Sequence, residues 1–273
     1  MPDISLPSHI LFFIGPIGVT NSLLSAFVIT IVITIGSFLA SRRMGIIPTR
    51  FQAAMEPLFE YVFSQVETAF GSKERAKKFF PLFMSLMLFI AIANQFSLVP
   101  LIASVLYDGK PLLRTATSDL SLTIALALFV VVFAHVIAFS ISPIRHIGNF
   151  IKVGAFFKVR SLGGFANALL EFALGLLDIV SEIAKVVSLS CRLFGNIFAG
   201  EVMVAVIASL TIWTTFIVPI PFIFLSLFSG FVQAFVFTLL SIQFIAGTIR
   251  GHLDTADERA SRKQKLALSS PKT

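Results

Sequence analysis

A set of ionisable and hydrogen-bonding side chains recurs at helical spacing inside a run that is otherwise apolar enough for a membrane. At about 100° per residue these positions fall within about 120° on one side of a helix. A charged side chain at bilayer depth costs on the order of 2.5–3.5 kcal/mol on insertion scales, so such residues usually face a partner or an aqueous path. This polar stripe is the candidate functional site. Its members are Asp178, Glu182, Lys185, Ser188, Arg192 and Asn196.

Arg192 differs from the other charges of the stripe because no carboxylate lies three or four positions away from it. Glu182 and Lys185 can pair with each other at i, i+3, and Asp178 could join them. A structural ion pair is therefore as good an account of those two residues as a functional one. Arg192 needs a counter-charge from elsewhere in the chain or from another protein.

A second group of polar side chains lies in the next apolar run. Its members fall within about 100° of one another on a helix, and they are Ser226, Ser229, Gly230 and Gln233. The small residues favour close packing. The long amide of Gln233 needs partners at depth and favours the wall of a water path. Glu201 lies about 140° from Asp178 on its helix, off the stripe, where it would face another compartment or this second run.

The composition explains why these residues are treated as membrane-embedded. The chain has 273 residues, of which 56% are hydrophobic and 13% charged, and 31 are phenylalanine. One soluble core could not cover that apolar surface, which indicates an all-α polytopic membrane protein. The net charge of +7 does not indicate nucleic acid, because the basic residues flank apolar runs without a recognised nucleic-acid motif. The single cysteine, Cys191, permits neither a disulfide within the chain nor a cysteine metal site.

A span needs roughly 20 apolar residues, which makes the candidates countable. We expect one membrane domain with about five membrane helices, the last two forming a hairpin of long, tilted or broken helices with its turn near 214–221. The expected helices are 21–40, 80–106, 119–142, 163–213 and 220–249. Ser118 and Asp119 are plausible caps of the third. An amphipathic surface helix is expected at 50–70, and a charged, loosely ordered cytoplasmic tail at 250–273.

The basic residues predict the orientation. Three groups of them, in 41–78, 143–162 and 250–273, alternate with the sparsely charged 107–118 loop. Five spans with an outside N-terminus and an inside C-terminus would give this pattern. No lysine or arginine precedes Arg42, so a cleavable signal peptide is not expected and the first apolar run is expected to remain as a span.

Two motifs resemble one known family. The stretch SLSCRLFGNIFAGE at 188–201 and the stretch FVQAFVFTLLSIQFIAGTI at 231–249 are similar to the RLFGN-type and QAF-type helices of subunit a of F-type ATP synthases. The stretches NQFSLVP at 94–100 and TSDLSLTIALAL at 117–128 resemble the family's second span and the beginning of its next one. The resemblance covers most of the chain.

The resemblance implies a stator subunit that holds two long tilted helices against a rotating ring of small subunits, each with a membrane carboxylate. It implies that Arg192 is the essential arginine facing the ring. Asn196, Glu201 and Gln233 would line or support the ion path, and Asn94 would contribute to the outer half-channel. Asp178 and Ser188 would occupy polar positions on the ring-facing or channel side. The residues of the half-channels would also include Ser226 and Asp119.

The chain departs from the family pattern at two positions. Many members have a histidine or glutamate seven positions before the QAF-type glutamine, where this chain has Ser226. Some members have a carboxylate where this chain has Ser97. Glu201 is retained, so the titratable group would reside there. Both departures leave the detailed proton route open.

The implied activity is ion translocation within the ATP synthase complex, coupled to ring rotation and ATP synthesis, and not catalysis by this chain alone. The implied partners are the ring of c-type subunits, the b-type peripheral stalk, the F1 ATPase head and the lipid bilayer. No cofactor and no metal are expected. The expected location is a bacterial plasma membrane, with protons as the default ion. The sequence does not decide between H⁺ and Na⁺, and it gives neither the number of subunits in the ring nor any bias between ATP synthesis and hydrolysis.

Two other function classes fit the residues. One is a self-contained secondary transporter that uses the arginine and carboxylates to bind an anion, although paired inverted halves are not evident. The other is an assembly scaffold whose polar stripe docks a partner helix. Co-purification with a ring of small subunits and an ATPase head would favour the rotary complex, whereas substrate-dependent transport by the isolated chain would favour the transporter.

Overall fold

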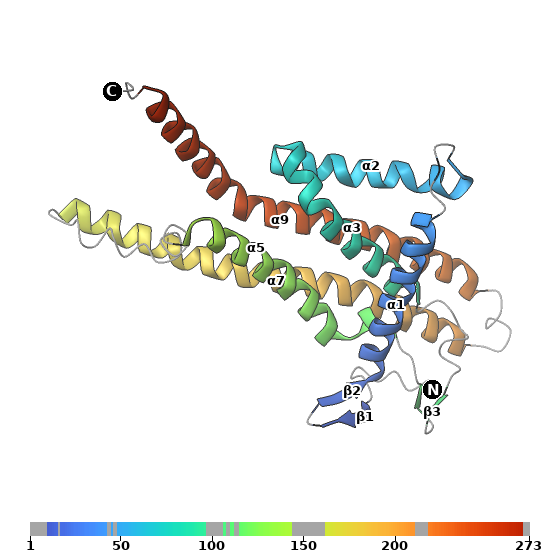
Figure 1. Cartoon of the computed structure of the whole chain (residues 1–273). Coiled ribbons are helices and arrows are strands. Elements are labelled where there is room, and N and C mark those ends of the chain that lie inside the picture. The colour runs from blue at the N-terminus through green and yellow to red at the C-terminus, as the bar shows by residue number, and fades with distance from the viewer. Residues whose placement is uncertain are drawn as a thin grey trace. The chain divides into compact units, whose positions relative to one another are not determined.

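A computed structural model of the chain is shown in Figure 1. It describes residues 10–15, 17–42, 45, 48–96, 106–107, 110–111, 115–143, 162–210 and 218–269. Two compact units can be distinguished. The first contains Met1–Leu126 and Leu189–Ile242, and the second contains Ala127–Ser188 and Gln243–Thr273.

Four helices are long and apolar enough to cross a membrane: α1 (Asn21–Arg42), α3 (Lys73–Phe96), α5 (Leu120–Ile141) and the Ile220–Arg250 part of α9. Helix α7 (Leu162–Leu210) is also long, but it carries the charged residues of the polar stripe. With α7 the described helices agree with the predicted all-α polytopic fold of about five membrane helices.

Helices α7 and α9 are longer than a perpendicular span requires. Helix α7 has 49 residues and is continuous, where a broken helix was the alternative. At about 1.5 Å per residue it extends about 74 Å, against roughly 30 Å of hydrocarbon, which favours strong tilting. Helix α9 (Pro219–Ser269) has 51 residues. The predicted turn between these helices lies largely at 211–217, outside the described residues.

Helix α9 continues through Ser269, so most of the range expected for the charged tail, 250–273, is helical, which the sequence analysis did not predict. The reason is visible in the sequence. Residues 252–269 contain neither glycine nor proline and are rich in alanine, leucine, lysine and arginine, which are strong helix formers. Glu258 and Arg262 also stand at i, i+4, a spacing that supports a helix.

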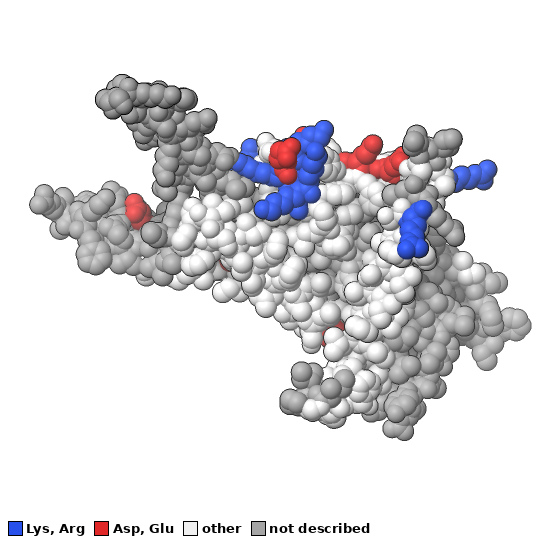
Figure 2. Space-filling model, in the orientation of Figure 1, with Lys and Arg blue, Asp and Glu red and all other residues white. Residues whose placement is uncertain are grey.

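Helix α2 (Arg50–Phe70) occupies the range expected for the surface helix. It begins at Thr49, whose hydroxyl accepts a hydrogen bond from the Gln52 amide, and ends at Gly71, which adopts the left-handed conformation. Aromatic rings attach it to α3, with Phe70 stacked on Phe79 at 4.6 Å between ring centroids. Figure 2 shows charged side chains gathered over α2 and the beginning of α3, above a surface that is almost free of charge.

In the first unit, α1 packs against α3 and the short 3₁₀ helix η1 (Ala116–Ser118). The contact contains Ala26, Ile29, Ala93 and Ala116. Small side chains at this crossing allow the backbones to approach closely. Polar residues at the beginning of α1, Asn21, Ser22 and Ser25, are also buried.

Two short antiparallel hairpins were not foreseen from the sequence. Strands β1 (Ile10–Ile14) and β2 (Ile17–Thr20) pair immediately before α1, and their turn contains Gly15 with a φ of 64°. Strands β3 (Leu106–Tyr107) and β4 (Lys110–Pro111) form the second hairpin. Leu106 was expected at the end of the second membrane helix. Helix α3 instead covers Lys73–Phe96, and 97–105 lies outside the described residues.

Candidate functional site

The first unit brings polar side chains of α3, α7 and α9 together in a three-helix seam. The amide of Asn94 donates from Nδ2 to the Gly230 carbonyl oxygen at 2.9 Å. The neighbouring Gln95 donates from Nε2 to the Leu227 carbonyl oxygen, also at 2.9 Å. Both carbonyls belong to α9, so two adjacent side chains of α3 attach it to one turn of that helix.

Helix α7 joins the seam through Asn196 and Ser229. The Asn196 Nδ2 donates to the Ser229 carbonyl oxygen at 3.2 Å, and the Ser229 hydroxyl donates to Asn196 Oδ1 at 2.7 Å. Such a reciprocal pair fixes the register between the two helices because a shift would break both bonds. The seam thus comprises Asn94, Gln95, Asn196, Leu227, Ser229 and Gly230.

Glycines permit the close approach of these helices. A Cβ added at Gly230 would lie 3.1 Å from Asn94 Cβ, and one added at Gly200 would lie 3.1 Å from the Ser226 hydroxyl oxygen. Ser226 therefore lies beside the residue that precedes Glu201. Asn196 pairs with Ser229 while Gly200 lies opposite Ser226, so α7 and α9 run antiparallel in this unit, as the hairpin prediction requires.

Gln233 follows the seam along α9 and is buried. Its Nε2 atom has no hydrogen-bond partner among the residues that the structure describes. A buried amide donor without a partner is costly, so this position calls for water or for a group from another molecule. The sequence-based expectation that Gln233 needs partners at depth stays a prediction.

Arg192 lies on α7 four residues before Asn196, and its side chain is exposed. No ion pair or hydrogen bond joins its guanidinium to any residue in the described part of the chain. Glu201 is half-buried on the same helix, five residues beyond Asn196. The first unit therefore brings Asn94, Asn196, Ser226 and Gln233 to the region where α3, α7 and α9 meet, and leaves Arg192 on an exposed face.

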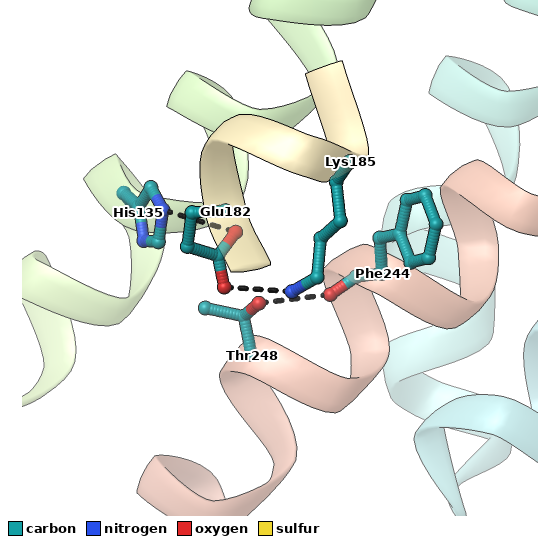
Figure 3. A network of polar contacts seen from close by, with 5 residues as sticks. All are labelled: His135, Glu182, Lys185, Phe244 and Thr248. Atoms are coloured by element: carbon teal, nitrogen blue, oxygen red, sulfur yellow. Dashed lines mark hydrogen bonds and ion pairs between the residues drawn. The ribbon is translucent and has the colours of Figure 1, made fainter. Parts of the chain in front are cut away.

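The second unit pairs the other charges of the stripe (Figure 3). The Lys185 ammonium lies 2.6 Å from Glu182 Oε1, and His135 Nε2 of α5 lies 3.5 Å from Glu182 Oε2. Of the two accounts left open for Glu182 and Lys185, the structure shows the ion pair. Sequence reasoning missed His135, because nothing in its own apolar helix predicts which face of α7 that helix contacts. We call His135, Glu182 and Lys185 the ion-pair cluster.

Three predicted residues remain, Asp178, Ser188 and Asp119. Asp178 and Ser188 are exposed on α7 in the second unit. Asp119 precedes α5 in the first unit, where its Oδ1 accepts a hydrogen bond from the Ser121 amide at 2.9 Å. This is the capping role expected from the sequence. Sequence reasoning also missed Gln95, which only its contact with α9 distinguishes.

The described residues contain no group of three or more histidine, cysteine, aspartate or glutamate side chains that could hold a metal ion. The predicted site residues and their neighbours supply hydrogen-bonding amides and hydroxyls, the ion-pair cluster, the carboxylates of Asp119, Asp178 and Glu201, and the exposed guanidinium of Arg192. Such a set can relay protons, solvate an ion path or attract an anionic partner group.

Comparison with known proteins identifies relatives of this chain. The family model for the ATP synthase A chain matches residues 22–246. A subunit a of ATP synthase from Moorella thermoacetica is 32% identical over 246 residues, which cover 89% of this chain and 96% of that protein. A second subunit a from Pelobacter propionicus is 32% identical, covering 88% and 91%. Another from Syntrophobacter fumaroxidans is 31% identical, covering 81% of each chain.

Proposed function

Because the chain belongs to the ATP synthase A chain family, we propose that it provides the ion path of an F-type ATP synthase and the arginine that faces the ring of the rotor. The candidate membrane helices indicate a multi-pass membrane protein, and the family is one that takes part in ATP synthesis and ion transport. The family match favours this function over the secondary transporter and the scaffold.

One observation carries the proposal. Within the described residues, the polar stripe divides: Glu182 and Lys185 form an ion pair, Asn196 bonds to Ser229, and Arg192 is exposed without an ion-pair partner. A permanently charged side chain in a membrane needs a counter-charge. Carboxylates of a partner ring would supply one, and they would do so in turn as the ring rotates.

Arginine suits this role for a physical reason. Its guanidinium stays protonated in proteins, so it attracts a carboxylate without passing on a proton. A nearby positive charge also favours the ionised carboxylate and lowers its pKa. An ion must therefore leave the ring carboxylate before that group meets Arg192, and another must bind afterwards. Arg192 acts as the attractor and as the barrier against a direct leak between the two half-channels.

The half-channels would be lined by the polar residues of the seam and its surroundings. We assign Asn94 to the outer half-channel, with the ion path supported by Asn196, Glu201, Ser226 and Gln233. The buried, unbonded Nε2 of Gln233 supports this assignment, since it needs water or a foreign group. Asp119 would act near the outer end of the path, and Asp178 and Ser188 on the ring-facing or channel side.

The wider assignment follows from the charge pattern and the family. We propose an outside N-terminus, a cytoplasmic C-terminus and a bacterial plasma membrane, with protons as the coupling ion. The partners are the ring of c-type subunits, the b-type peripheral stalk and the F1 head. ATP chemistry takes place in that head, so the chain is an ion-translocating subunit and not an enzyme by itself.

The replacement Arg192→Ala tests the proposal. We expect the complex to assemble and to lose ion-driven ATP synthesis, measured in inverted membrane vesicles with an imposed proton gradient. Arg192→Lys should also be severely defective, because lysine lacks the planar fork and can lose its proton when buried. Normal coupled synthesis by an assembled Arg192→Ala complex would contradict the proposal.

A further inference from the structure

The ion-pair cluster lies where three helices of the second unit meet (Figure 3). Glu182 and Lys185 come from α7, His135 comes from α5, and the Phe244 ring of α9 lies under the Lys185 ammonium at 5.5 Å from its centroid. Each oxygen of the Glu182 carboxylate has its own partner. The cluster therefore contacts both neighbouring helices through one turn of α7.

The side chains of the cluster are only partly covered within the chain. The exposed fractions are 26% for His135, 21% for Glu182 and 25% for Lys185. Lys185 Nζ also lies within reach of the aromatic face of Phe244, which attracts a cation. The nearby Thr248 hydroxyl donates to the Phe244 carbonyl oxygen of its own helix, so it does not compete for the carboxylate.

We infer that the ion-pair cluster is a clamp that sets the rotation of α7 about its axis and so directs Arg192, and is not a station on the ion path. Lys185 and Arg192 are seven residues apart on one continuous helix, so they differ by only about 20° in direction. A contact that fixes the direction of Lys185 fixes that of Arg192 as well. The positioning residues are His135, Glu182 and Lys185.

Charge chemistry distinguishes a clamp from a proton relay. Removing one partner of a buried pair leaves an uncompensated charge and is strongly disruptive, whereas replacing both partners with uncharged residues is often neutral. The contacts to the other helices are those of Glu182 with His135 and of Lys185 with Phe244. The double variant Glu182→Gln/Lys185→Met leaves no uncompensated charge, keeps an amide that can hydrogen-bond His135, and keeps a thioether that can pack on the Phe244 ring. In a clamp, the double variant is therefore less defective than either single variant. In a relay, both titratable groups are lost together, and the double variant is at least as defective as the singles.

The experiment uses the assembled complex in native membranes. ATP-driven proton pumping per assembled complex is measured for Glu182→Gln, Lys185→Met and the double variant. We expect each single variant to fall at least about threefold and the double variant to recover most of that loss, as for strongly coupled neighbours. The matched control is Glu171→Gln, which removes an exposed carboxylate from nearly the same face of α7 and should leave pumping unchanged.

A second readout reports on position instead of activity. Native Cys191 is exposed and precedes Arg192, so the rate at which a membrane-permeant maleimide modifies it depends on the direction of this part of α7. We expect the rate to change at least about threefold in the single variants and to return towards the parent rate in the double variant. Where a single variant fails to accumulate, the double variant should restore accumulation.

The outcomes are decisive in both directions. A double variant that restores neither accumulation nor pumping overturns the clamp, as do single variants with parental pumping and parental Cys191 modification. The inference rests on the proposed role of Arg192, but the two fail separately. Arg192→Ala with normal coupling would contradict the proposed function, while recovery in the double variant and the Cys191 rate would still report on the clamp.

Discussion

At the residue scale, the seam shows how amides attach one helix to the backbone of another. Carbonyl oxygens of α9 have a second lone pair beyond their helical bond, and Asn94 and Gln95 donate to two of them. The donor is therefore the important feature of these side chains. A change that keeps the shape and removes the donor separates that effect from packing.

We predict that Asn94→Asp and Gln95→Glu both lower the thermal stability of the purified complex. Each change keeps the side-chain size but places a carboxylate against the Gly230 or Leu227 carbonyl, at the site of a 2.9 Å hydrogen bond. For the buried Asn94, leaving a polar group without its partner costs about 1–3 kcal/mol, and more when the group is charged. Gln95 is only partly buried, so its replacement should have the smaller effect. Gln65→Glu on α2 is the control: it makes the same change at a side chain for which no hydrogen bond is found within the described part of the chain, and it should change the melting temperature little. An unchanged melting temperature for both seam variants would show that these bonds do not stabilise the junction.

The residue types and spacing predicted the stripe and the isolation of Arg192, because helical geometry alone places those side chains on one face. They could not predict the division of the stripe. Asn196 bonds to Ser229 and Glu182 lies near His135 because of the register of α9 and α5 against α7, and no local sequence pattern encodes that register. The roles of the individual ion-path residues remain predictions.

At the scale of elements, the ends of the helices agree with the sequence-based prediction where the sequence contains a capping residue. Asp119 caps α5, Thr49 caps α2, and Gly71 ends it, so these helices lie close to the expected ranges. Before Asn21 the sequence contains one turn signal, the Gly15–Pro16 dipeptide, which the prediction did not use, and the short apolar stretches on either side of it pair as the β1–β2 hairpin. Length and composition cannot separate a short apolar strand from the beginning of a helix.

Close approach of α9 to α3 predicts opposite effects for two glycines of one helix. Gly230→Ala would place a Cβ 3.1 Å from Asn94 Cβ, whereas a Cβ at Gly247 would meet nothing within 4 Å in the described chain. Alanine is otherwise favoured over glycine in a helix by about 1 kcal/mol, so Gly247→Ala should be neutral or stabilising. Gly230→Ala should cost about 1–3 kcal/mol through overpacking. Melting temperatures of the two complexes measure the contrast, and equal shifts would argue against close contact at Gly230.

At the scale of the whole molecule, the distribution of lysine and arginine is the feature that bears on orientation. The long apolar helices α1, α3, α5 and the first part of α9 define where the chain crosses, but they are consistent with either direction. The basic groups at 41–78, 143–162 and 250–273 favour one direction, since basic loops are retained in the cytoplasm. An odd number of crossings then places the two ends on opposite sides.

We predict that the N-terminus is outside and the C-terminus is in the cytoplasm. In a Cys191→Ser background, which removes the one native thiol, Ser5→Cys should react with a membrane-impermeant maleimide in intact spheroplasts. Ser270→Cys should react only after the membrane is opened or in inverted vesicles. Because α7 must cross for the ends to differ, the same labelling tests whether this charged helix is a span. Labelling of both ends from one side would mean an even number of crossings, and Arg192 would then lack the transmembrane setting that its role between two half-channels requires.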